Sequence, residues 1–154
     1  MKIGIVVFSN TGHTAKLAKL IAKKLTENNH AVELLPLEIA GRTSPVAVSV
    51  ALKSTPLIDE FDAVIFGFPV WGGKPPVVMS TYLDRVGSLE GKKAACFATH
   101  FFFPAWGGNQ SLNMIKGICK SKGADFLGTG SVQWFSLRRN ALMNKVAEEI
   151  SAYF

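Results

Sequence analysis

Short apolar runs alternate with longer helical patterns along this chain of 154 residues. The apolar runs have the length of strands and occupy residues 2–8, 30–35, 63–67, 94–99 and 124–132. Apolar side chains at helical spacing occupy residues 14–28, 75–85, 110–122 and 140–154. Repeated strand–helix units imply a parallel sheet with helices on both faces. The sequence therefore predicts an α/β sandwich around five parallel strands.

Residues 45–53 carry two conflicting signals. Ser44 and Pro45 form a good helix start, whereas Val46, Val48 and Val50 alternate as in a strand. Parallel strands require a long crossover between them. We therefore expect a helix over residues 45–53.

The length of the chain suits one domain with a proper core, so we expect a single domain over residues 1–154. Hydrophobic residues make up 48% of the chain and charged residues 18%, which argues against disorder. No apolar run reaches the roughly 20 residues of a membrane span, and the N-terminus shows no signal-peptide cleavage site. Cys96 and Cys119 lack metal-ligand spacing and are expected to be reduced core thiols. These features predict a cytoplasmic protein without a membrane partner and without a metal site.

The net charge of the chain is +6. Its lysines are scattered in ones and twos without a basic run, so we do not expect nucleic acid as a partner. An acidic protein partner or an anionic ligand accounts for the charge as well.

The loop between the first predicted strand and the first predicted helix is rich in hydroxyl groups. It consists of Ser9, Asn10, Thr11, Gly12, His13 and Thr14. A helix N-terminus offers unpaired N–H groups and a positive dipole end to an anion. The loop has no Lys or Arg and matches neither the nucleoside-triphosphate P-loop nor the dinucleotide glycine pattern. Two interpretations stay open, a hydroxyl-rich helix cap and a binding site for a single phosphate monoester.

Two further loops follow the third and fourth strands and are rich in aromatic residues. In the first, an exposed Trp71 would suit stacking on a flat ring, although it could also fold back over the core. Its candidate binding residues are Pro69, Val70, Trp71, Gly72 and Gly73. The second loop could form a binding surface or a hydrophobic lid. Its candidate binding residues are Thr99, His100, Phe101, Phe102, Trp106, Gly107 and Gly108. Because ligands of parallel sheets bind beyond the carboxyl ends of the strands, all three loops should form one site.

Ser-x-Thr-Gly-x-Thr after strand one, Pro-Val-Trp-Gly-Gly after strand three and a glycine-rich loop after strand four resemble the flavodoxin family. The resemblance covers essentially the whole chain. It implies a flavodoxin-like three-layer sandwich with strand order 2-1-3-4-5, and FMN as the cofactor. It further implies that residues 9–14 bind the FMN phosphate, that Trp71 stacks on the isoalloxazine, and that residues 99–108 contact its other face or its pyrimidine edge.

Two departures from that family bear on function. Flavodoxins that act as low-potential carriers are usually acidic, whereas this chain is basic, and the third loop here reads Thr-His-Phe-Phe-Phe-Pro. The resemblance implies an electron-transfer protein that shuttles electrons between a reductase and an acceptor protein, without catalytic residues of its own. The alternative is a small FMN-dependent NAD(P)H:quinone-type reductase. A flavoprotein that activates a partner enzyme also stays open, whereas a phosphoacceptor domain is excluded because the required carboxylates are missing. We expect redox partners with an acidic docking patch, and a monomer or weak dimer.

Overall fold

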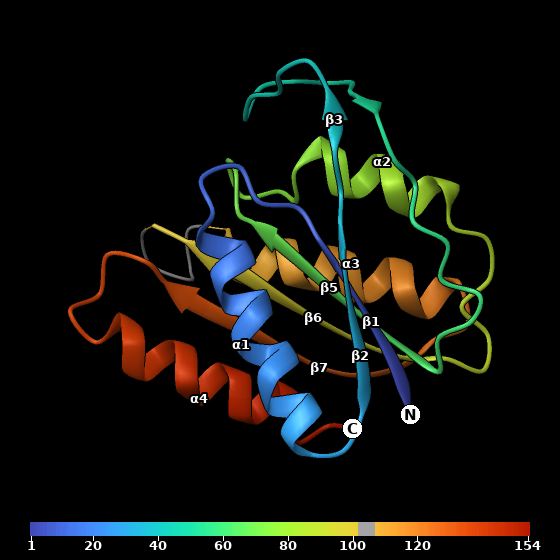
Figure 1. Cartoon of the computed structure of the whole chain (residues 1–154). Coiled ribbons are helices and arrows are strands. Elements are labelled where there is room, and N and C mark those ends of the chain that lie inside the picture. Colours follow the sequence, from blue (N-terminus) through green and yellow to red (C-terminus); the bar gives the residue numbers. More distant parts are fainter. Residues whose placement is uncertain (102–106) are drawn as a thin grey trace.

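A computed structural model describes residues 1–101 and 107–154 of the chain. Its main sheet has five strands in the order β2-β1-β5-β6-β7, and all neighbouring strands run parallel (Figure 1). The strands are β1 (Lys2–Val7), β2 (Ala31–Pro36), β5 (Ala63–Pro69), β6 (Lys93–His100) and β7 (Asp125–Gln133). Counted within this sheet, the order is 2-1-3-4-5. The predicted flavodoxin-like topology is therefore confirmed.

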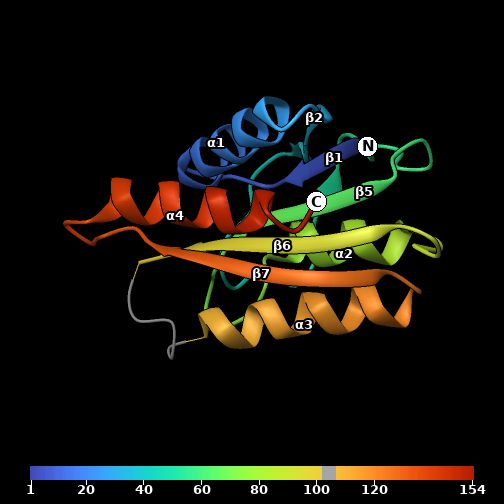
Figure 2. The ribbon, with the colours of Figure 1, turned by 90° about the horizontal axis from the view of Figure 1, so that it is seen from below.

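The helices of residues 1–101 and 107–154 form the two outer layers (Figure 2). They are α1 (His13–Glu27), α2 (Val77–Arg85), α3 (Gly108–Ser121) and α4 (Arg139–Ser151). The apolar sides of α1 and α4 pack on one face of the sheet, and those of α2 and α3 pack on the other. Each helix begins within two residues of its predicted start. The helical spacing of apolar residues predicts these segments because those residues form the buried side of each helix.

The side chains of β1 point alternately to the two faces of the sheet and contribute to the core on both. Ile3 and Ile5 pack with Leu17 and Ile21 of α1, whereas Val6 points to the α2 and α3 side. Successive side chains of a strand point to opposite faces, so one apolar run can serve both layers. Each fully buried aliphatic side chain contributes roughly 1.5–3 kcal/mol relative to its exposed state.

The prediction of a helix over residues 45–53 was wrong. The chain there is irregular, and two short strands, β3 (Ile39–Ala40) and β4 (Ala51–Leu52), pair antiparallel beside α2 (Figure 1). Val46 and Val48 are 86% and 93% exposed, so no apolar helix face could be buried at this place. The crossover is held to α2 by Tyr82, whose hydroxyl donates to the carbonyl of Pro56 at 2.8 Å.

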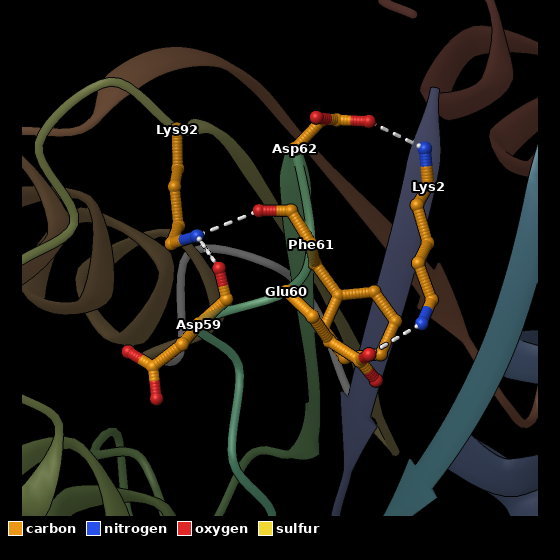
Figure 3. Close-up of polar contacts among 6 residues, drawn as sticks. All are labelled: Lys2, Asp59, Glu60, Phe61, Asp62 and Lys92. Atoms are coloured by element: carbon orange, nitrogen blue, oxygen red, sulfur yellow. Dashed lines mark hydrogen bonds and ion pairs between the residues drawn. The ribbon is translucent and has the colours of Figure 1, made fainter.

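Charged side chains at the amino ends of the strands are engaged in structural contacts (Figure 3). Lys2 Nζ lies 2.8 Å from Glu60, and the Lys2 backbone N–H donates to the Asp62 carboxylate at 2.7 Å. Lys92 Nζ donates to the carbonyl oxygens of Asp59 and Phe61. These contacts fix the loop that enters β5. The opposite end of the sheet carries the candidate site.

Within residues 1–101 and 107–154, no helix combines the length and the apolar character needed to cross a membrane.

Candidate functional site

The loop at residues 9–14 turns directly from β1 into α1. The Gly12 N–H donates to Ser9 Oγ at 3.1 Å, and Gly12 adopts a φ of +90°, which only glycine adopts readily. Among the described residues, no side chain caps the N-terminus of α1. The hydroxyl-rich cap considered from sequence is therefore not formed, and the first N–H groups of α1 stay available to an anion.

Thr14 and Thr99 connect two of the three predicted loops. Their hydroxyl oxygens lie 2.8 Å apart, and both side chains are buried. A hydroxyl group has one donor and two acceptor positions, so each threonine keeps capacity for a further hydrogen bond. This contact holds the start of α1 against the end of β6.

The loop after β5 folds into a tight turn at Gly72 and Gly73. Trp71 and Lys74 exchange two backbone hydrogen bonds of 3.2 and 3.1 Å across this turn. Both glycines have positive φ, at 57° and 78°, which matches the turn type favoured by closely paired extended segments. The half-buried Trp71 ring meets Phe8 edge-on at 5.6 Å, so it packs partly on the core and partly lines the site.

Gly73 and Gly107 bring the second and third loops into contact. A Cβ atom on Gly107 would overlap the backbone of Gly73, and Gly107 has a φ of +107°. Gly108 follows as the first residue of α3 and is buried. Phe102 and Trp106, which were also predicted to contact the cofactor, lie outside the described residues.

One cavity gathers residues of all three loops. Its predicted lining residues are Asn10, Thr11, His13, Thr14, Pro69, Val70, Trp71, Thr99, His100 and Phe101. Ser9 and Gly72 instead line adjoining hollows that share Asn10 and Trp71 with this cavity. Gly12, Gly73, Gly107 and Gly108 shape the surrounding backbone rather than the cavity wall. The expectation that the carboxyl ends of β1, β5 and β6 meet at one place is met.

Trp134 also lines this cavity, and sequence reasoning missed it. Its ring stacks on the His13 imidazole at 4.0 Å with an interplanar angle of 15°, and Phe101 meets His13 edge-on at 6.0 Å. Trp134 follows the end of β7, so the rule that identified the other three loops could have found it. Pro45 of the crossover is a second unforeseen lining residue.

The surroundings of the His13 imidazole disfavour its charged form. Burial lowers its pKa below 6.5, and the positive charges of Arg139 and Lys16 lower it further. Among the described residues, the cavity lining contains no carboxylate. The site therefore combines backbone N–H groups, hydroxyls, an imidazole and large aromatic rings.

The sequence of the chain is similar to known proteins. A family model described as NADPH-dependent FMN reductase matches residues 1–114. The chain is 31% identical over 117 residues to an NAD(P)H dehydrogenase (quinone) of Archaeoglobus fulgidus, covering 64% of this chain and 61% of that protein. It is 28% identical over 115 residues to an NAD(P)H quinone oxidoreductase of Candida albicans, covering 64% of this chain and 39% of that protein. The chain spans about half the length of the curated relatives it matches.

The fold has solved counterparts. A flavodoxin of Streptococcus pneumoniae superposes with a TM-score of 0.70 over 100% of both chains, at 18% sequence identity. At this identity the likeness establishes the fold alone.

Proposed function

The chain belongs to the NADPH-dependent FMN reductase family and binds FMN. We propose that it is a flavoenzyme that reduces a quinone with NAD(P)H. The net reaction is NAD(P)H plus a proton plus quinone giving NAD(P)⁺ plus quinol. The sequence alone favoured an electron carrier and kept this reductase as the alternative. Two relatives favour the reductase, because they are named as an NAD(P)H quinone oxidoreductase and an NAD(P)H dehydrogenase (quinone).

The residues of the site fit FMN. The uncapped start of α1, together with Ser9 and Thr11, would hold the phosphate. Trp71 and the other aromatic residues of the cavity would contact the flat isoalloxazine. When bound, FMN supplies two-electron chemistry between a nicotinamide nucleotide and an acceptor.

The protein's own contribution is binding and orientation. The Thr14–Thr99 hydrogen bond and the Gly73–Gly107 contact hold the three loops at fixed spacing. The aromatic walls offer faces to a flat ligand, and the stacked His13 has a lowered pKa. The observation that carries the proposal is this aromatic cavity, which lies against an uncapped helix start in a chain of this family.

An electron carrier remains the second candidate, and one observation favours it. Phe135 and Leu137, which follow Trp134, are 68% and 106% exposed, and Phe135 contacts Phe101 of the cavity at 5.0 Å. An apolar surface beside a redox site could receive a protein partner. We propose for this case a partner with an acidic patch, because the chain carries a charge of +6.

Two measurements separate these functions. The purified protein should show flavin absorbance and release FMN, rather than FAD, on heating. Steady-state oxidation of NADPH and NADH with a soluble quinone should then show turnover of the quinone. Absence of turnover with both nucleotides, in a protein whose flavin is reduced by a separate reductase, would refute the enzyme and support the carrier.

A further inference from the structure

The connection between β7 and α4 carries exposed apolar side chains beside the candidate cavity. It projects past the carboxyl ends of the strands (Figures 1 and 2). Phe135 and Leu137 are exposed on it, and the Phe135 ring packs against the exposed Phe101 ring, which also lines the cavity. These three residues form the apolar patch. Clustered apolar side chains on a surface of this kind mark a site of interaction.

The backbone that carries the patch is fixed by hydrogen bonds. At the start of the turn, the Trp134 N–H donates to the His100 carbonyl at 2.7 Å. Further along, the Arg138 N–H donates to Ser136 Oγ and the Arg139 N–H donates to the Ser136 carbonyl, both at 3.1 Å. The apolar side chains of the turn are therefore held outward in a preset position. Because little chain entropy remains to be lost, burying them against another surface costs less.

The charges of the chain are segregated between the two edges of the sheet. Nine of the eleven acidic residues lie at the amino edge, where four precede β5 and β6, one opens β7 and four lie in the last turns of α1, α2 and α4. At the cavity edge, Arg42, Lys53 and Lys74 line hollows that adjoin the cavity, and Arg138 is exposed beside the patch. Among the described residues that follow strands at this edge, Glu38 is the only acidic one. The positive charge of the chain is therefore concentrated around the cavity, where it complements an anionic surface.

We propose that the apolar patch and the cations around it dock the protein on an anionic lipid membrane. Phe and Leu side chains on a projecting turn can enter the interface of a bilayer without a matching pocket, and Arg and Lys beside them attract anionic headgroups. The expectation of no membrane partner rested on the absence of a spanning segment, and a surface of this kind binds lipid without one. Docking does not depend on the reaction that the cavity carries out, and it would bring the cavity to the lipid.

Flotation of the FMN-loaded protein with lipid vesicles tests the docking surface. The protein should bind vesicles of phosphatidylcholine mixed with phosphatidylglycerol, fail to bind phosphatidylcholine alone, and lose binding as salt rises. Leu137→Ser should weaken binding by about tenfold, because an apolar side chain no longer enters the interface. Arg138→Gln should weaken it by about fivefold, the size expected for one cation at an anionic membrane.

Matched controls remove the same kinds of side chain away from the patch. Leu57 is an exposed apolar residue that precedes β5, and Lys120 is an exposed cation in the last turn of α3. Leu57→Ser and Lys120→Gln should bind the anionic vesicles nearly as wild type does. Because all of the substituted side chains are exposed, each variant should fold.

A fluorescent label separates insertion of the patch from adhesion by charge alone. Cys96 and Cys119 are buried, so a thiol-reactive nitrobenzoxadiazole dye would label the Leu137→Cys variant at its new thiol. Its emission should shift to shorter wavelength with the anionic vesicles, because the dye leaves water. The dye on a Leu57→Cys variant should not shift.

Wild-type protein that does not float with anionic vesicles would overturn the proposal and leave the patch to an acidic protein. Equal losses in the test and control variants, or unshifted emission at position 137, would also overturn it, because binding would then follow net charge. Failure of the proposed function has a different signature. Protein that binds vesicles through the patch but reduces no quinone refutes the reductase and keeps the docking surface.

Discussion

The hydroxyl oxygens of Thr14 and Thr99 lie 2.8 Å apart in a buried hydrogen bond between the start of α1 and the end of β6. Thr14 closes the phosphate-type loop, and Thr99 opens the aromatic loop that follows β6. Two segments that are far apart in the chain are thereby fixed to each other in the wall of the cavity. A buried polar pair of this kind fixes the distance between two loops of a site, because each hydroxyl depends on the other for its hydrogen bond.

Replacing one member of this pair should destabilise the fold more than replacing both. Thr14→Val or Thr99→Val leaves a buried hydroxyl without its partner, at a cost of about 1–3 kcal/mol. The double variant removes both polar groups and keeps their volume, so its loss should be well below the sum of the single losses. Urea unfolding of the FMN-free protein measures this. Strictly additive losses would show that the hydrogen bond contributes nothing.

Gly107→Ala should damage the site, whereas alanine at a glycine within α3 should not. At Gly107 the new methyl group would overlap Gly73, and the φ of +107° adds strain of about 1–3 kcal/mol. Gly117 lies within α3 with open space around it, so Gly117→Ala should stabilise the helix by roughly 0.5–1 kcal/mol. Thermal unfolding and FMN affinity of both variants check this. Similar behaviour of the two variants would contradict the close approach of the loops.

Trp71→Ala should weaken FMN binding by about 1–3 kcal/mol, judged from aromatic stacking on nucleobases. Trp71→Phe should retain a large part of that affinity, because it keeps an aromatic face. Quenching of tryptophan fluorescence by added FMN measures binding, and unfolding of the FMN-free variants measures the packing on Phe8. Lost stability with unchanged FMN affinity would assign Trp71 to the core.

The pKa of His13 should be below 6.5 in NMR titration of the FMN-free protein, and Arg139→Gln should raise it. The folded protein then binds fewer protons than the unfolded chain at pH values between the lowered pKa and 6.5. Stability therefore rises with pH through that window, and protonation of His13 below it destabilises the fold. His13→Gln should flatten this part of the stability profile. An unchanged profile would show that the surroundings of His13 do not disfavour its charge.

The bound flavin should have a less negative midpoint potential than the flavin of acidic flavodoxins. The described lining of the cavity has no carboxylate, and the exposed Lys74 lies at the turn beside it. One unit charge several ångströms away contributes on the order of 1–3 kcal/mol at an effective dielectric constant near 20, which corresponds to tens of millivolts or more. Lys74→Glu should lower the potential in a spectroelectrochemical titration, with Lys53→Glu as a control at an adjoining hollow. A wild-type potential as low as that of acidic carriers would refute this expectation.

Much of the fold could be predicted because its signals are local. The apolar runs of β1, β5 and β6 and the helical spacing of α1 report burial segment by segment. The prediction of a helix over residues 45–53 was wrong because a helix start signal leads to a helix only where an apolar helix face can be buried. There, Val46 and Val48 face outward instead.

The sequence by itself determined the layered α/β architecture and the chemical character of the three loops, since periodicity and turn residues act over a few positions. Only the tertiary structure decided which distant side chains meet. It stacked His13 on Trp134 and joined Thr14 to Thr99. These contacts depend on how the helices and loops pack across the sheet, and no pattern within a single segment predicts that packing.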